Sequence, residues 1–182
     1  MKYAILCTAV VTLAGTAHGA IFSEVENNNT LALANDIGTY GAPGDSILID
    51  GVLGINDVDW FSFTITDDAS LSVFSAFGAS GDGVMQLVAD GGDVIAFDDD
   101  SGIDLMPAIQ VLNLTAGTYF LGFSGFGDVD AGSVDSDELA DGLGHQENFG
   151  YKLTIGFSIV PAPGALALAG MGGIVMTRRR RA

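Results

Sequence analysis

The sequence predicts an all-β protein, an antiparallel β-sandwich of about eight short strands arranged like a jelly roll. In residues 59–66, DWFSFTIT, the apolar side chains of Phe61, Phe63 and Ile65 fall on every second position. Every second residue of 151–157, YKLTIGF, is likewise apolar or aromatic. A period of two residues is typical of a strand with one buried face. Clusters of Gly and Asp, such as ASGDG, DGGD and DDDSG, separate these runs and favour tight turns.

Six further runs have the composition of strands and recur at a spacing of roughly ten residues. Such regular spacing is typical of antiparallel sandwiches. Before them, residues 31–37 are expected to form one helical turn, capped by Asn29 or Thr30. The six runs are residues 46–53, 71–77, 84–89, 94–97, 108–114 and 117–123.

One segment, residues 125–148, breaks this spacing. It is polar, rich in glycine and contains seven carboxylates. Loops of this length in compact domains are either functional or disordered. The sequence leaves open whether this segment is a functional loop or a solvated, disordered one.

The first 19 residues have the three parts of a secretory signal peptide. Lys2 supplies a positive charge, residues 4–14 are apolar, and a small-x-small pattern ends at Gly19. We therefore expect a signal helix that engages the secretion translocon, with cleavage between Gly19 and Ala20. Cys7, the one cysteine of the chain, would be discarded with it.

The C-terminal end carries a short apolar segment, residues 164–177, followed by four arginines. As a helix, 14 residues would span about 21 Å, less than the bilayer core of about 30 Å. The positive-inside rule would place the arginines in the cytoplasm and the body outside the inner membrane. Such a segment is either a plain tail anchor or a sorting tag that is recognised and cut.

The same residues resemble the tripartite PEP-CTERM sorting domain, the signal read by membrane transpeptidases called exosortases in bacteria that make extracellular polysaccharide. The resemblance implies an exosortase as partner, a membrane-anchored precursor, and a final place at the cell surface or in the extracellular matrix. Ala162 departs from the signature, which has Glu there. The matching residues are Val160, Pro161, Ala162 and Pro163, then Arg178, Arg179, Arg180 and Arg181.

The body between these ends is strongly acidic. In residues 20–160, Lys152 is the one basic residue against 23 acidic ones, a formal charge of −22. Such a body repels nucleic acid and anionic membrane surfaces and attracts divalent cations. A nucleic-acid-binding function is therefore excluded.

Four blocks of the body resemble the bacterial pre-peptidase C-terminal domain, a calcium-associated β-sandwich found in many secreted and surface proteins. They are residues 24–30, 57–63, 114–120 and 151–155, in that order. The resemblance implies a calcium site in which the Trp60 carbonyl completes a shell of side-chain oxygens. The implied ligands are Glu24, Glu26, Asn28, Asn29, Asn56, Asp59 and Trp60.

The implied site is poor in charge. Asn29 stands where that family usually has Asp, and Asn56 is uncharged as well, so three carboxylates remain. Calcium takes six to eight oxygen ligands, and we expect weak binding.

The chain thus divides into a signal peptide (1–19), a β-sandwich domain (20–159) and a sorting signal (160–182). Residues 97–102, FDDDSG, and the long loop resemble the subset of these domains that commonly carries a PEP-CTERM tail. A member of that subset would have both the pre-peptidase C-terminal type of body and the PEP-CTERM type of tail.

Two other acidic stretches have the D-x-D spacing of cation-binding loops. One contains Asp98, Asp100 and Asp104, and the other contains Asp128 and Asp130. Neither continues into the glutamate that closes an EF-hand loop. We expect solvated turns at both places rather than cation sites.

The resemblance and the lack of catalytic motifs lead to a non-catalytic exported surface or matrix protein as the predicted function. Without Cys7 no thiol remains, and His145 is the one candidate base of the mature chain. An extracellular hydrolase using His145 is the least favoured alternative.

A binding module for polysaccharide or protein is the main alternative to this function. It should expose aromatic side chains on one face, and the candidates are Trp60, Phe74, Tyr119 and Phe126.

Overall fold

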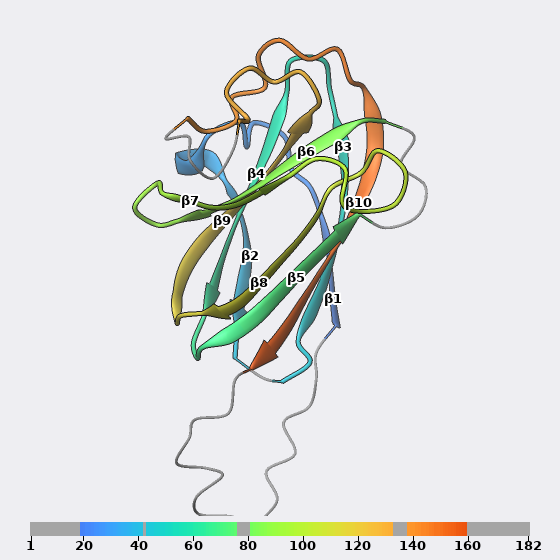
Figure 1. Cartoon of the computed structure of the whole chain (residues 1–182). Coiled ribbons are helices and arrows are strands. Elements are labelled where there is room, and N and C mark those ends of the chain that lie inside the picture. The colour runs from blue at the N-terminus through green and yellow to red at the C-terminus, as the bar shows by residue number, and fades with distance from the viewer. Residues whose placement is uncertain (1–18, 42, 76–80, 133–137, 160–182) are drawn as a thin grey trace, which may run out of the picture.

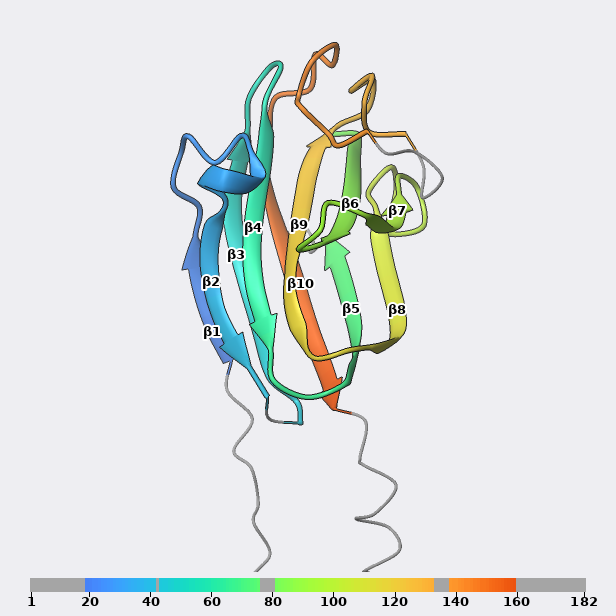
Figure 2. The same cartoon turned by 90° about the vertical axis from the view of Figure 1, so that its left-hand side faces the viewer.

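The computed structural model describes residues 19–41, 43–75, 81–132 and 138–159. These residues form two five-stranded sheets packed face to face (Figures 1 and 2). The first sheet has the order β1-β3-β10-β5-β8, and the second has the order β2-β4-β9-β6-β7. The strands are β1 (Gly19–Ser23), β2 (Asn35–Tyr40), β3 (Ser46–Leu53), β4 (Val58–Ile65), β5 (Ala69–Ser75), β6 (Gly83–Ala89), β7 (Val94–Asp98), β8 (Ala108–Leu114), β9 (Gly117–Gly125) and β10 (Phe149–Ile159).

The β-sandwich prediction is confirmed. The eight strands from β3 to β10 have the order of a double-sheet jelly roll, β3-β10-β5-β8 in one sheet and β4-β9-β6-β7 in the other. The prediction of a purely antiparallel fold is wrong at one edge. β1 pairs with β3 in parallel, and β2 pairs with β4 in parallel, so both sheets are mixed.

The two parallel edge strands were not predicted from the sequence. β1 lies at the predicted signal-cleavage position, and β2 contains Gly38 with φ 110° and a register shift between Asp36 and Thr39. Gly38 and the register shift interrupt the alternation of side chains in β2, and β1 begins where the signal peptide was expected to end. The helical turn predicted for residues 31–37 is confined to the 3-10 helix η1 (Leu31–Leu33), and its N-cap Thr30 makes no side-chain cap bond.

The alternating side chains fill the space between the sheets, as predicted. Phe61, Phe63 and Ile65 are buried, and so are the apolar residues of β10 that face them. Aromatic rings meet across the sandwich: Tyr40 stacks on Phe157 with ring centroids 4.8 Å apart. Burial of each large side chain contributes roughly 1.5–3 kcal/mol to the free energy of unfolding.

A second apolar cluster lies on the outer face of the second sheet. Trp60 points outward there and is 1% exposed, because η1 and the long loop cover it. Gly122, its partner on β9, leaves room for the indole: a Cβ would lie 2.7 Å from the ring. Trp60 is buried in this cluster and Tyr119 in the core between the sheets, so neither can serve as an exposed aromatic of a binding face. Phe74 and Phe126 are half exposed.

The long loop is packed in the parts that the structure describes, residues 126–132 and 138–148. Asp128 and His145 are both buried. Asp128 accepts hydrogen bonds from Ser124 Oγ at 2.7 Å and from Gly142 N at 2.9 Å. Of the two alternatives that the sequence left open, a fully solvated loop does not fit Asp128 and His145.

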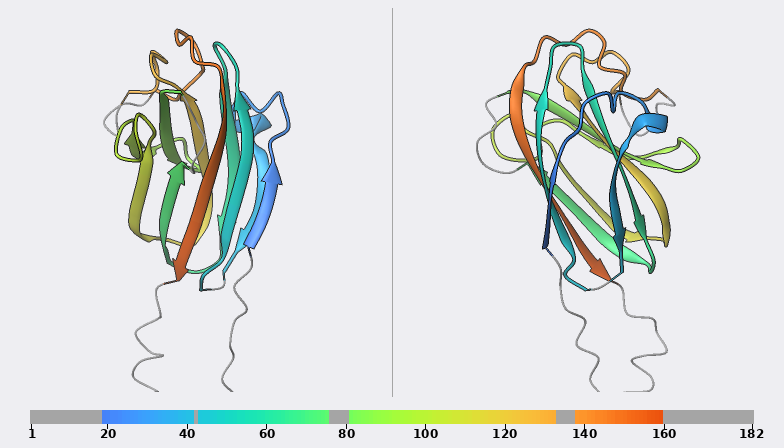
Figure 3. Two further views of the ribbon diagram at one scale, coloured as in Figure 1. Left: turned by 90° about the vertical axis from the view of Figure 1, so that its right-hand side faces the viewer. Right: turned by 180° about the vertical axis from the view of Figure 1, so that it is seen from behind.

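The segment between β1 and β2 crosses from the first sheet to the second at the end opposite to the start of β1 (Figure 3). β1 begins and β10 ends together at the other end (Figure 1). The predicted signal peptide, apart from Gly19, and the predicted sorting signal lie outside the described residues. Among those that are described, no helix is long and apolar enough to cross a membrane.

Candidate cation site

Three carboxylates converge where the chain leaves β1. Glu24 and Glu26 follow that strand, and Asp59 lies on β4. One carboxylate oxygen from each residue lies within 4.8 Å of the others. Glu24 is held in place because its N–H donates to the carbonyl of Asp50 at 3.0 Å, which continues the pairing of β1 with β3.

The segment after β1 is shaped by two asparagines and by β4. The Asn35 side chain bonds both the N–H and the carbonyl of Val25, at 2.8 and 3.0 Å. Asn27 has φ 73°, a left-handed conformation that Asn tolerates. The Trp60 N–H then donates to the carbonyl of Asn28 at 3.0 Å, which lays Asn28 along β4.

Each of the inner polar side chains has one atom engaged with the protein. Glu24 Oε2 accepts from Val52 N at 2.8 Å, and the Asn28 amide nitrogen donates to the Trp60 carbonyl at 3.5 Å. Asp59 Oδ2 accepts from the Tyr151 hydroxyl at 2.7 Å. These bonds fix the side chains and decide which oxygen of each remains.

The remaining oxygens, Glu24 Oε1, Asn28 Oδ1 and Asp59 Oδ1, are buried and accept no hydrogen bond from an N–H or hydroxyl group of the described residues. The carboxyl groups of Glu24 and Asp59 can hydrogen-bond each other only when one of them is protonated. Asn28 and Asp59 are 0% exposed. Leaving a buried polar atom unsatisfied costs about 1–3 kcal/mol, and more when it is charged. Three such acceptors on residues that adjoin one another are the pattern that a cation ligand set leaves.

A glycine makes the room for this arrangement. Gly51 on β3 lies opposite Tyr151 on β10. A Cβ at Gly51 would overlap the end of the Tyr151 ring and lie 2.9 Å from Glu24 Oε2. Any side chain at this position would displace the tyrosine or the carboxylate.

Without a cation, the carboxylates are electrostatically strained. Burial raises the pKa of Asp59 to about 9, and the negative charges of Glu24 and Asp57 add to the effect. Burial also raises the pKa of Glu24. A bound cation would favour the charged forms of both groups.

The donor set has the chemistry of a hard-cation site. Glu24, Glu26, Asn28 and Asp59 offer carboxylate and amide oxygens, and the Trp60 carbonyl lies against the Asn28 amide. Calcium prefers such oxygens. Five protein ligands are fewer than six to eight, so water would complete the shell.

The other two residues implied by the resemblance brace the surroundings. Asn29 donates from its amide nitrogen to Asp57 Oδ1 at 2.7 Å. Asn56 has φ 53°, and its side-chain oxygen accepts from Gly144 N in the long loop at 3.2 Å. The Asn29 bond uses the amide nitrogen and not the oxygen, so the roles of Asn29 and Asn56 as ligands stay predictions.

His145 ties the long loop to the turn before β4. Its Nδ1 faces the Glu147 N–H at 3.2 Å, and its Nε2 lies 3.1 Å from the Asp57 N–H and 2.8 Å from the Asp57 carbonyl. The imidazole is 1% exposed. Its polar partners are backbone groups, and Ser124 donates separately to the same Asp57 carbonyl at 3.2 Å.

Each D-x-D stretch uses one carboxylate for local structure, the half-buried Asp98 in one and the buried Asp128 in the other. Asp98 accepts from Ser101 N and Ala108 N through Oδ2, at 2.9 and 2.8 Å. Asp128 Oδ1 accepts from Asp130 N at 3.1 Å. The expectation of a solvated turn is wrong for Asp128, which is buried. Asp98 is partly exposed and holds the turn after β7 in place through these hydrogen bonds.

The geometry therefore defines a jelly-roll β-sandwich with a candidate cation site at one end. No family model matches this chain, and no curated protein matches it. Among solved structures it is similar to PliG of Aeromonas hydrophila, a periplasmic inhibitor of g-type lysozyme, with 15% identity, a TM-score of 0.42, and coverage of 68% of this chain and 99% of that one. It is also similar to the pre-peptidase C-terminal domain of a collagenase from Bacillus anthracis, with 16% identity, a TM-score of 0.40, and coverage of 67% and 93%. At these scores neither likeness carries an argument about function.

Proposed function

We propose that the protein is a non-catalytic, exported β-sandwich module whose N-terminal segment is held in place by a calcium ion. The observation that carries the proposal is a set of three buried oxygens, on Glu24, Asn28 and Asp59, that accept no hydrogen bond from an N–H or hydroxyl group of the described residues. A divalent cation would satisfy all three at once and offset the repulsion between the carboxylates.

The ion would act as a structural clip. Glu24 and Glu26 follow β1 of the first sheet, whereas Asp59 belongs to β4 of the second. A calcium ion bound by all three residues would join the two sheets at the edge of the sandwich that the parallel strands β1 and β2 form. Because Glu26 is exposed and only three carboxylates contribute, we expect a dissociation constant of about 10⁻⁴–10⁻³ M, the range of extracellular calcium modules.

The route to the cell surface is proposed from the sequence. Residues 1–19 direct export, and the residues from Val160 onward resemble an exosortase signal. Because β10 ends at the pole opposite the candidate site (Figure 1), a membrane-bound tail would leave the cation site pointing away from the membrane. The body then functions at the surface or in the extracellular matrix.

Calorimetric titration of the purified protein with calcium tests the proposal. We expect one binding event, lost when Glu26→Gln is combined with Asp59→Asn. Asp90→Asn is the matched control, because Asp90 is an exposed carboxylate in the turn between β6 and β7. Equal calcium binding by the double variant and the control would refute the site.

A further inference from the structure

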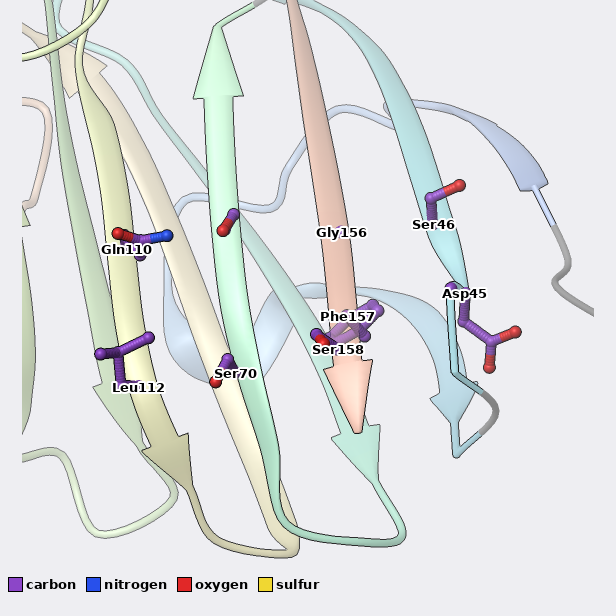
Figure 4. A pocket seen from close by; sticks show the side chains of 10 residues that line it. Asp45, Ser46, Ser70, Gln110, Leu112, Gly156, Phe157 and Ser158 are labelled. Carbon is purple, nitrogen blue, oxygen red and sulfur yellow. The ribbon is translucent and has the colours of Figure 1, made fainter. Parts of the chain in front are cut away.

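A polar groove of about 450 Å³ lies on the outer face of the first sheet (Figure 4). Four of its residues form one row across four strands, because Gly156 on β10 pairs with Ser46 on β3 and with Ser72 on β5, and Ser72 pairs with Gln110 on β8. Residues directly opposite in a sheet share a face. With strands about 4.8 Å apart, the row spans roughly 14 Å.

Five uncharged polar side chains of this groove have no hydrogen-bond partner among the described residues. No hydrogen bond joins the side chains of Ser46, Ser70, Ser72, Ser158 or Gln110 to any residue that the structure describes. Each serine offers one donor and two acceptor positions, and the glutamine amide offers both kinds. Ligand hydroxyl groups, which also donate and accept, match this set.

Gly156 forms the open floor of the groove. No heavy atom lies within 4 Å of the position that a Cβ would take there. The space above the strand is therefore free, and a larger side chain would fill it without displacing the protein.

The charge of the groove and of the body around it selects against anionic ligands. Its lining contains no lysine or arginine, and its one carboxylate, Asp45, is 6% exposed and accepts from Gly41 N at 3.2 Å. The body around it carries a formal charge of −22, which repels polyanions. The groove complements a neutral ligand.

Apolar side chains lie beside the hydroxyls. Leu112 lines the groove and is 66% exposed, and Phe74, two residues beyond Ser72 on the same face of β5, is 50% exposed. A sugar ring presents both hydroxyl groups and an apolar face of C–H groups, and so fits this mixture.

We propose that this groove binds a neutral polysaccharide. The inference adds a ligand to the calcium-held module and does not depend on the ion, because the groove and the cation site are built from different residues.

Affinity electrophoresis of the full chain in gels that contain dextran, mannan or galactan tests the proposal, with alginate as the acidic comparison. We expect retardation by at least one neutral polymer. Gly156→Leu should weaken that binding at least tenfold by filling the groove, and Ser72→Ala with Gln110→Ala should weaken it several-fold without filling it.

Gly91→Leu is the matched control. Gly91 lies in the turn between β6 and β7 and also has no heavy atom within 4 Å of a Cβ position, so this variant should bind like the parent. Asp59→Asn should bind polysaccharide normally, which separates failure of the groove from failure of the calcium site.

Three results would overturn the proposal. They are the absence of retardation by all three neutral polymers, equal binding by the Gly156→Leu and Gly91→Leu variants, and binding to alginate alone. A concentration-dependent dimer that disappears in Gly156→Leu would instead assign this face to a second copy of the chain, and would also overturn it.

Discussion

The Tyr151 hydroxyl donates a 2.7 Å hydrogen bond to Asp59 Oδ2. The tyrosine belongs to β10 of the first sheet and the aspartate to β4 of the second, and both are almost fully buried. This bond across the sandwich engages one carboxylate oxygen and leaves Oδ1 for the cation site. Tyr151 is therefore a positioning residue for the proposed calcium ligand.

Tyr151→Phe should weaken calcium binding several-fold. The ring would still pack against Phe123, at a centroid distance of 4.4 Å, but Asp59 Oδ2 would lose its donor. We expect the calcium-free protein to lose about 1–3 kcal/mol of stability as well. Denaturant unfolding and calcium titration measure the two effects.

Tyr119→Phe is the control for this variant. Tyr119 is also buried, and its hydroxyl donates to the Thr115 carbonyl at 2.7 Å, away from the site. It should lose stability and keep its calcium affinity. If both variants bind calcium as the parent does, Tyr151 has no positioning role.

Gly51→Ala should disturb the site from the opposite strand. The added Cβ would press on Tyr151 and on Glu24 Oε2, and overpacking of this kind costs about 1–3 kcal/mol. Gly150→Ala is a close control, because the nearest atom to its Cβ would be 3.8 Å away. Circular dichroism melts in calcium and in chelator should show a reduced calcium effect for Gly51→Ala only. A full calcium effect in Gly51→Ala would contradict the geometry of the site.

The pH dependence of stability follows from the raised pKa of Asp59. The folded pKa, about 9, lies above the ordinary value of 3.8, so the folded state binds more protons than the unfolded state between these pH values. In chelator, the contribution of Asp59 is present in full near pH 4 and falls as the pH rises toward 9, by at most about 1.4 kcal/mol per pH unit. Asp59→Asn should flatten this slope in urea unfolding curves recorded from pH 5 to 8. An unchanged slope would show that Asp59 is ionised in the calcium-free fold.

Mass spectrometry of the protein isolated from its native envelope tests the proposed route. We expect a chain that begins at Ala20, ends near Pro163 and carries a covalent group at its new C-terminus. Recovery of intact Arg178–Arg181 would indicate a plain membrane anchor instead.

Much of the sandwich follows from local pattern, whereas the edges and the details of the site depend on distant pairing. The alternation in residues 59–66 and 151–157 predicts both strands and their buried faces because it depends only on a period of two. The roles of Tyr151 and Gly51 arise where β10 pairs with β3, a contact that no local pattern indicates.

The packing of the long loop also depends on contacts that its own sequence does not indicate. Its acidic, glycine-rich composition favours a solvated loop, but buried hydrogen bonds of Asp128 and His145 hold it against the sandwich. Glu24, Glu26 and Asp59 were named from a resemblance, and the structure brings them together. Asn56 was named in the same way, but its side-chain oxygen accepts a hydrogen bond from the loop.

The melting temperature of the purified protein in calcium and in chelator tests the central proposal most directly. A ligand that binds only the folded state stabilises it by about 2.7 kcal/mol at a hundred times its dissociation constant. We expect a melting temperature that rises with calcium concentration in the parent and in Asp90→Asn, and that does not change with calcium in the combined Glu26→Gln and Asp59→Asn variant. The same melting temperature for the parent in excess calcium and in chelator would contradict it.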